Sequence, residues 1–260
     1  MIFYFSGTGN SRYVAESLSR LLRQKVVRMT AATYSDAASI NVADPLTVWV
    51  FPIHSWGLPD FVVRFIKRVG SGCGLPFGGR HYMVCTCGDD VGLAHRQWRR
   101  LMSDKGWNTV AAYSVRMPNT YVLLPGFDVD SHDVASGKLD AARGRIEEVA
   151  RAISAGSVGD DVAEGGFPWI KSRVIYPYFM RHMISPKPFM ALADRCIGCG
   201  KCVSACPLDN VRLDASRRPV WGDDCTLCLG CYHVCPEQAV QYGGRTKCKG
   251  RYYCVRRSDF

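Results

Sequence analysis

Apolar and polar residues follow two different periods along the first 155 residues of the chain. Residues 1–5 form a short apolar run typical of a strand, and residues 11–24 carry apolar side chains at helical spacing. The same patterns predict strands over 25–29, 46–53, 81–87 and 109–116, and helices over 60–69, 93–105 and 138–155. Strands that alternate with helices in this way predict an α/β fold whose parallel sheet is covered by helices on both faces.

Changes in composition divide the chain into segments. Residues 156–166 contain glycines and acidic residues and predict a linker, so we expect a first domain over residues 1–165. The remaining segments are a connector over 166–190, a small Cys-rich domain over 191–242 and a basic tail over 243–260. A domain of about 50 residues buries too little apolar surface to fold well without a metal or a similar staple.

A cysteine motif occurs twice within residues 191–242. The spacing is Cys-x2-Cys-x2-Cys-x3-Cys-Pro, and every position recurs 29 residues later. The first copy holds Cys196, Cys199, Cys202, Cys206 and Pro207, and the second holds Cys225, Cys228, Cys231, Cys235 and Pro236. Zinc more usually takes two well-separated Cys-x2-Cys pairs, and disulfides are not expected in a chain without a signal peptide, so both are weaker interpretations than iron–sulfur ligation.

This segment resembles the bacterial ferredoxins that carry two 4Fe-4S clusters. In that family the fourth cysteine of each motif binds the other cluster. The resemblance implies Cys196, Cys199, Cys202 and Cys235 as ligands of cluster 1, and Cys225, Cys228, Cys231 and Cys206 as ligands of cluster 2. The remaining cysteines, Cys73, Cys85, Cys87, Cys248 and Cys254, fit no pattern, and we expect them to be ordinary thiols.

The first predicted strand and helix are joined by a loop of small and hydroxylated residues. The loop consists of Ser6, Gly7, Thr8, Gly9, Asn10 and Ser11. Such a loop turns backbone N–H groups and a helix N-terminus toward an anion, but it lacks the Lys of a P-loop and the third Gly of a dinucleotide fingerprint. It closely resembles the phosphate loop of flavodoxins, which implies bound FMN and a flavodoxin-like, doubly wound sheet of five parallel strands.

Two later loops are expected at the same edge of the sheet. The loop after the third strand holds Pro52, Ile53, His54, Ser55, Trp56 and Gly57. The resemblance assigns flavin stacking to Trp56 and a peptide near flavin N5 to Gly57, whereas His54 is more often structural than a proton donor. The loop after the fourth strand holds Thr86, Cys87, Gly88 and Asp89. No second aromatic residue follows it, so the other flavin face is either open or covered by the ferredoxin part.

Two further segments lie outside these motifs. Residues 117–133 form a long loop after the fifth strand, which we interpret as a connection rather than a lid. The connector interleaves aromatic and basic residues, a composition that can bind single-stranded nucleic acid or a membrane surface. Because nothing else supports nucleic acid, we expect the connector to pack its apolar side chains on a domain. These are Trp169, Ile170, Val174, Ile175, Tyr176, Tyr178 and Phe179.

The formal net charge of the chain is +10. Two oxidised clusters contribute about −2 each and a flavin phosphate about −2 more, which leaves roughly +4. A basic face of this size suits an acidic redox partner protein, and no nucleic-acid partner is expected. The chain shows no signal peptide and no apolar run of about 18 residues, so we expect a soluble, cytoplasmic protein of a reducing, anaerobic cell.

Together these features predict an electron-transfer protein that couples one-electron cluster chemistry to flavin chemistry. A flavin-dependent reductase of a small organic acceptor is the alternative, and a redox-sensing or assembly module without turnover is a third hypothesis. No group of side chains typical of a hydrolytic site stands out, so no catalytic residue is assigned. Both an electron carrier and an oxidoreductase component fit the sequence.

Overall fold

The computed structural model describes residues 1–40, 45–70 and 79–254. Cys73 and residues 255–260 of the basic tail lie outside the described residues. Within the described part of the chain, every helix is too short or too polar to cross a bilayer.

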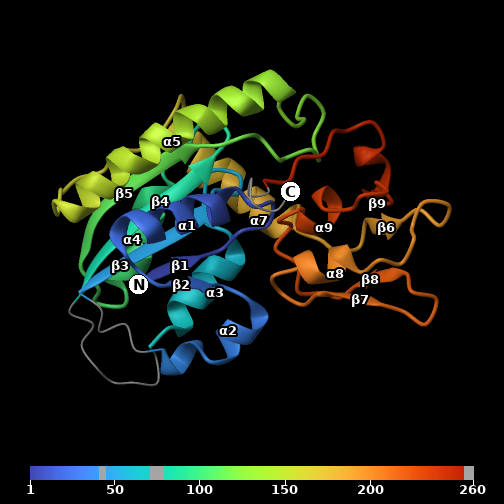
Figure 1. The fold of residues 1–260 in the computed structure, drawn as a ribbon, viewed down its shortest axis with the longest axis horizontal. Helices are drawn as coiled ribbons and strands as arrows, with labels where there is room; N and C mark the ends of the chain where they lie inside the picture. Colours follow the sequence, from blue (N-terminus) through green and yellow to red (C-terminus); the bar gives the residue numbers. More distant parts are fainter. Residues whose placement is uncertain (41–44, 71–78, 255–260) are drawn as a thin grey trace.

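Five parallel strands form the centre of the first module in the order β2-β1-β3-β4-β5 (Figure 1). The strands are β1 (Ile2–Tyr4), β2 (Val26–Arg28), β3 (Leu46–Pro52), β4 (Arg80–Cys87) and β5 (Thr109–Arg116). This is the flavodoxin-like order, and it confirms the predicted fold class. The order reverses between β1 and β3, and in such sheets the ligand crevice lies at the carboxyl ends of the strands at this point.

Helices cover both faces of the sheet. They are α1 (Asn10–Leu22), α2 (Ala31–Ser35), α3 (Asp60–Arg68), α4 (Ala94–Ser103) and α5 (His132–Ser154), with the short 3-10 helix η1 (Ala37–Ser39) after α2. Alternate residues of β3 face opposite sides: Trp49 packs in the core with α3 and α4, and Val48 in the core with α1 and α5. Figure 1 shows α5 and α3 on opposite sides of the sheet. Strands β1, β3, β4 and β5 are buried on both faces, which explains their nearly continuous apolar runs, whereas β2 at the edge of the sheet is partly exposed.

Two helices depart from the sequence prediction because of N-terminal capping. Helix α5 begins at His132, six residues before the predicted start, because the Ser131 hydroxyl accepts a hydrogen bond from the Val134 N–H. Helix α2 lies between the predicted strands 25–29 and 46–53, where no helix was predicted. The side chains of Thr30 and Thr33 form a reciprocal capping box at its start. Capping by short polar side chains therefore sets helix ends that apolar periodicity does not reveal.

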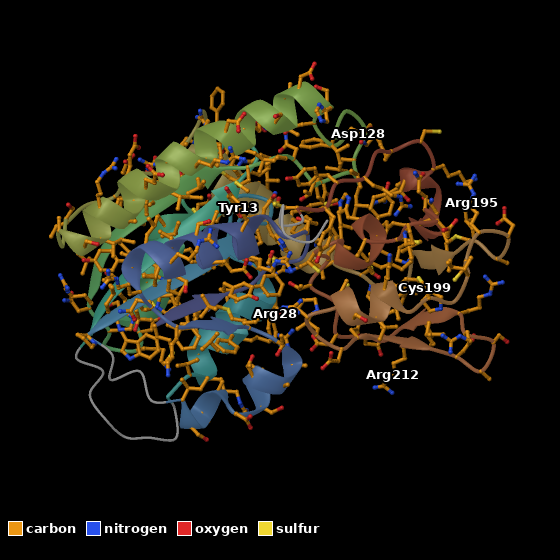
Figure 2. All side chains as sticks on the ribbon, viewed as in Figure 1. Tyr13, Arg28, Asp128, Arg195, Cys199 and Arg212 are labelled. Atoms are coloured by element: carbon orange, nitrogen blue, oxygen red, sulfur yellow. The ribbon has the colours of Figure 1, made fainter. Side chains whose placement is uncertain are left out.

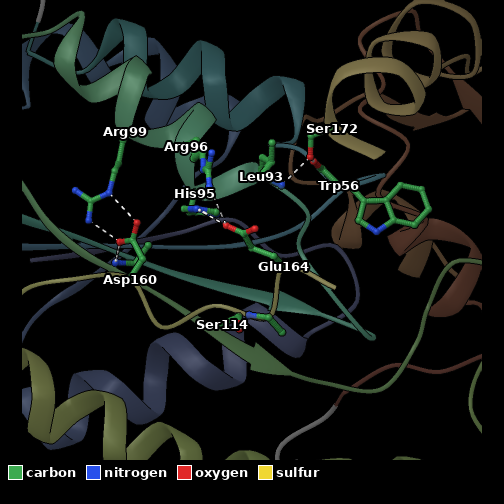
Figure 3. Close-up of polar contacts among 11 residues, drawn as sticks. Trp56, Leu93, His95, Arg96, Arg99, Ser114, Asp160, Glu164 and Ser172 are labelled. Atoms are coloured by element: carbon green, nitrogen blue, oxygen red, sulfur yellow. Dashed lines mark hydrogen bonds and ion pairs between the residues drawn. The ribbon is translucent and has the colours of Figure 1, made fainter. Parts of the chain in front are cut away.

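The segment 156–166 is attached along strand β5. The Asp161 N–H donates to the Ala112 carbonyl at 2.8 Å, and Asp161 forms an isolated parallel bridge with Tyr113 of β5. Arg99 donates from Nε to an Asp160 carboxylate oxygen at 3.0 Å, and His95 Nε2 lies 3.2 Å from Glu164 (Figure 3). The acidic residues of this segment therefore hold it against α4 and β5.

The connector continues as one helical segment into the second module. It consists of α6 (Pro168–Ile170), the π-helix η2 (Lys171–Ile175) and α7 (Tyr176–His182). The second module contains the antiparallel pairs β6 (Phe189–Ala191) with β9 (Val240–Tyr242) and β7 (Val211–Leu213) with β8 (Pro219–Trp221). Its helices are α8 (Lys201–Ala205), α9 (Gly230–His233) and the 3-10 helix η3 (Gly243–Thr246).

The packing expected for the connector is wrong for most of its apolar side chains. The Tyr176 hydroxyl donates to the Leu58 carbonyl at 2.7 Å and so faces the first module, whereas Phe179 is buried in the core of the second module. The other five expected residues, Trp169, Ile170, Val174, Ile175 and Tyr178, are exposed to between 39% and 63%. One face of the helical segment is anchored and the other faces outward, because its apolar residues continue around more of the helix than the first module covers.

Candidate functional site

A cavity of about 770 Å³, its open mouth included, lies at the carboxyl ends of β1, β3 and β4. Its walls come from both modules. Of the predicted cofactor-binding residues, all but Gly9, Trp56, Gly57 and Asp89 line it. The three loops that sequence analysis placed at one edge of the sheet therefore meet there, as parallel strands require.

The phosphate loop has the features of an anion site. Helix α1 begins after Gly9, whose φ of 93° favours glycine, and neither a side-chain cap nor an acidic residue occupies the first turn. Its terminal N–H groups are therefore free for an anion. The Ser11 hydroxyl lies 2.7 Å from that of Thr86, which joins two of the loops. None of the described residues that line the cavity carries a formal charge, so the donors for a phosphate are hydroxyls, amides and the helix N-terminus.

Asn10 offers a further group to a ligand. Its Nδ2 donates to the Pro118 carbonyl at 2.9 Å, which fixes the side-chain amide. Its Oδ1 is buried and has no hydrogen-bond partner among the described residues. A buried acceptor without a partner costs free energy, so this atom suits a ligand hydroxyl such as those of a ribityl chain.

Trp56 and Gly57 lie on the connector side of their loop and not in the cavity. The Ser172 hydroxyl donates to the Trp56 carbonyl at 2.8 Å, and Lys171 Nζ lies 5.2 Å from the centre of the Trp56 ring. Figure 3 shows the indole directed away from the sheet. A Cβ atom on Gly57 would lie 2.3 Å from the Tyr176 ring, so the connector fills the space beside it. The contact with the connector thus determines where Trp56 points.

His54 lies in the cavity wall between the two modules. Burial lowers the pKa of its imidazole to about 4, although a backbone hydrogen bond with Thr226 acts in the opposite direction. The ring is therefore neutral at pH 7.

Sequence analysis considered a cover from the ferredoxin part, but it did not name the residues of the second half of the cavity wall. These residues are Met117, Pro118, Asn119, Thr120 and Tyr121 after β5, Phe179 of α7, and Leu227, Cys228 and Leu229 of the second Cys motif. Tyr121 and Phe179 meet edge to face, with ring centres 6.3 Å apart. The position of residues 117–121 at the carboxyl end of β5 was the available signal, because every such end borders the crevice.

Each predicted cluster site is a separate cavity in the second module. One cavity of about 340 Å³ is lined by Cys196, Cys199, Cys202 and Cys235, and another of about 340 Å³ by Cys206, Cys225, Cys228 and Cys231. The fourth cysteine of each motif thus lies with the first three of the other. The two halves also match in detail: the Asn210 N–H donates to Cys206 Sγ at 3.4 Å, and the Ala239 N–H, 29 residues later, donates to Cys235 Sγ at 3.3 Å.

The thiols of the second cavity are strongly buried. Burial raises the pKa of the Cys225 thiol to about 11 and that of Cys228 to about 12. Ligand thiols must lose their protons to bind iron, so cluster assembly in this cavity releases protons that burial otherwise retains. A cysteine-lined, largely apolar cavity of this kind fits a 4Fe-4S cluster.

The phosphate loop packs directly on the cluster-2 motif. A Cβ atom on Gly7 would lie 2.6 Å from the Cys228 carbonyl oxygen and 3.1 Å from its sulfur. From the other side, a Cβ atom on Gly230 would lie 2.7 Å from the Gly7 carbonyl oxygen. Only glycine permits this approach, so the phosphate loop and the cluster-2 motif touch backbone to backbone.

Further contacts fix the two modules together. The Nε2–H of His233 in α9 donates to the Thr120 carbonyl at 2.8 Å. Its Nδ1 accepts a hydrogen bond from the Tyr252 N–H at 3.2 Å. The Cys254 N–H donates to the Thr8 carbonyl at 2.8 Å, so the tail covers the phosphate loop. The walls of the cavity thus come from loops of the first module and from the second module, and the tail packs on the phosphate loop.

Comparison with known proteins supports each module separately. Residues 191–242 match the family of 4Fe-4S dicluster domains. A ferredoxin of Methanothermococcus thermolithotrophicus is 40% identical over 50 residues, which cover 18% of this chain and 83% of the ferredoxin. The formate dehydrogenase-O iron-sulfur subunit of Escherichia coli is 33% identical over 66 residues, and the chain spans about a fifth of its length.

The first module is similar to several solved structures at low identity. The Trp repressor binding protein of Bacillus subtilis has a TM-score of 0.39 at 16% identity, covering 56% of this chain and 95% of that structure. An FMN-dependent NADH-azoreductase of Bacillus anthracis has a TM-score of 0.37 at 13% identity, covering 58% of this chain and 97% of that structure. Similarity at this level establishes no shared ligand or reaction.

Proposed function

The chain belongs, through residues 191–242, to the ferredoxins with two 4Fe-4S clusters, and from this premise we propose that it transfers electrons between those clusters and FMN bound in the cavity. FMN exchanges one or two electrons, whereas each cluster exchanges one. The observation that carries the proposal is the direct contact of Gly7 in the phosphate loop with Cys228 of the cluster-2 motif. In this arrangement cluster 2 is the neighbour of the flavin.

The residues around the cavity have separable roles in this proposal. The N-terminus of α1, with the hydroxyls of Thr8 and Ser11, holds the phosphate, and Asn10 Oδ1 accepts from the ribityl chain. Tyr121 and Phe179 place aromatic surface in the wall and limit the access of water.

Cluster 1 lies on the outer side of the second module, where a redox partner has access to it. Cys199 is exposed, and Arg195 lies at the same outer edge (Figure 2). Arg217 and Arg218 donate to the carbonyls of Gly198 and Cys196 beside the cluster. These cations favour an acidic redox partner protein, and the order of transfer is then partner, cluster 1, cluster 2 and FMN.

Anaerobic purification with flavin, iron and sulfide quantification tests the cofactor content. Substitution of Thr8 by Glu should abolish FMN retention, because a carboxylate repels the phosphate dianion, whereas Thr8→Ser keeps the hydroxyl and should retain FMN. Full flavin occupancy in Thr8→Glu would place the phosphate elsewhere.

Stopped-flow reduction of the holoprotein tests the relay. Reduction of the clusters should be followed by flavin reduction at a rate that is independent of protein concentration. A rate proportional to protein concentration would show that the two modules serve different molecules. Turnover of a small organic acceptor at the flavin would instead favour the reductase.

A further inference from the structure

The connector presents an apolar face that the proposed electron transfer does not use. It consists of Phe167, Trp169, Ile170, Val174 and Tyr178, whose side chains are 78%, 63%, 46%, 53% and 61% exposed. Ile170, Val174 and Tyr178 recur every four residues, so they lie along one side of the helical segment. Single exposed apolar residues are ordinary, but five of them within residues 167–178 mark an interaction surface. We refer to these five residues as the connector face.

The opposite side of the segment is anchored, so the connector face has a fixed direction. Lys171 Nζ lies 2.6 Å from an Asp90 carboxylate oxygen, and the Ser172 hydroxyl accepts a hydrogen bond from the Leu93 N–H at 2.7 Å (Figure 3). Tyr176 is bonded to the first module, and Phe179 is buried in the core of the second. The segment is therefore not a free tether, and the exposed side chains keep their outward direction.

Cations flank the connector face. Residues 165–193 contain no Asp or Glu, and Arg173 and Arg181 are exposed within them. Arg173 also lines a surface hollow together with Arg96 and Arg100 of α4. Three carboxylates near the segment are paired with basic side chains: Asp90 with Lys171, Glu164 with Arg96 and His95, and Asp60 with Arg64. The surface around the apolar stripe is thus predominantly positive.

We propose that the connector face binds an anionic phospholipid surface. A helical segment that exposes Trp, Phe and aliphatic side chains with arginines beside them lies in the interface of a bilayer, with its apolar side chains among the acyl chains and its cations among the phosphates. Single-stranded nucleic acid stacks its bases on aromatic rings, but it offers no apolar surface to the exposed aliphatic side chains of Ile170 and Val174. A lipid surface can bury all five side chains of the connector face, and it requires no shape complementarity.

Flotation of the holoprotein with vesicles tests the proposal. Vesicles of phosphatidylcholine with phosphatidylglycerol should bind the protein, and vesicles of phosphatidylcholine alone should bind it at least tenfold less. Val174→Glu should lower binding to the anionic vesicles at least tenfold, because it places a carboxylate in the apolar stripe. Val158→Glu is the matched control: Val158 is 85% exposed outside the connector, so its substitution should leave binding unchanged.

A charge-reversal pair separates the electrostatic contribution. Arg173→Glu combined with Arg181→Glu should lower binding at least tenfold, whereas Arg212→Glu on β7 of the second module should have little effect. Equal binding of Val174→Glu and the native protein would overturn the proposal. Concentration-dependent dimerisation without vesicles that Val174→Glu abolishes would assign the connector face to a second copy of the chain, and this result would also overturn it.

Discussion

Replacement of Gly230 by alanine tests the contact between the two modules. A Cβ atom at this position would lie 2.7 Å from the Gly7 carbonyl oxygen, well inside the 3.4 Å at which ordinary contact begins. Gly230 is the first residue of α9 and its φ is not positive, so alanine suits the local backbone. The phosphate loop is therefore the main obstacle to this substitution.

Two opposing effects determine the size of the change. Alanine is favoured over glycine in a helix by up to about 1 kcal/mol. Overpacking of a close contact costs about 1–3 kcal/mol. We expect Gly230→Ala to lower the free energy of unfolding by about 1–2 kcal/mol. It should also weaken FMN retention and slow electron transfer from cluster to flavin, because the phosphate loop is displaced from the cluster-2 motif.

The matched control is Gly144→Ala in helix α5. Gly144 is exposed, and a Cβ atom there would meet nothing within 4 Å. This variant should gain up to about 1 kcal/mol in the free energy of unfolding. Urea unfolding of both anaerobic holoproteins, monitored by flavin fluorescence, gives the two free energies of unfolding. Stopped-flow reduction of each holoprotein gives the rate of flavin reduction. If Gly230→Ala were as stable as Gly144→Ala and reduced its flavin as fast, the two loops would not touch and the route through cluster 2 would be wrong.

Three further predictions concern the clusters and the core. Cys199→Ser should lower the iron and sulfide content, whereas Cys248→Ser should leave both unchanged; equal loss in the two variants would contradict the ligand assignment. Trp221 donates from Nε1 to Cys231 Sγ at 3.5 Å, so Trp221→Phe should make the potential of cluster 2 more negative in an EPR-monitored titration and leave cluster 1 unchanged. Burial lowers the pKa of His81 from 6.5 to about 4, so its contribution to stability is complete above pH 6.5 and is lost as the pH falls toward 4. The contribution of His81 to the free energy of unfolding should therefore fall by about 2 kcal/mol between pH 6.5 and 5. The native protein should lose more stability than His81→Asn over this range, and identical slopes would show that His81 does not titrate there.

The sheet and the cluster sites were predictable because their signals are local or repeated. Apolar periodicity identifies β3 and β4 without reference to the rest of the chain, and parallel pairing then brings Ser11 and Thr86 to one edge. The doubled motif resembles the two-cluster ferredoxins, and this resemblance implied the crossing of Cys206 and Cys235, each of which lines the cavity of the other motif.

The remainder of the site depends on contacts between distant segments. Tyr121 and Phe179 line the cavity only because the loop after β5 and the connector meet there, and neither belongs to a recognisable motif. Trp56 occupies the expected position in the sequence, but Ser172 and Lys171 hold its loop on the connector side. Local patterns do not contain such information, because the direction of a loop side chain depends on what packs beside it.

The hydrogen bond from the Cys254 N–H to the Thr8 carbonyl has a consequence for biosynthesis. The phosphate loop is made well before the segments that pack on it, the cluster-2 motif and residues 250–254, because more than 200 residues separate them along the chain. Contacts of such large sequence separation form late in folding. A nascent chain can therefore build its sheet early, but the wall between the phosphate loop and the cluster-2 motif forms only after that motif has been made. Under the proposed function, iron–sulfur assembly and flavin capture would thus be linked in time.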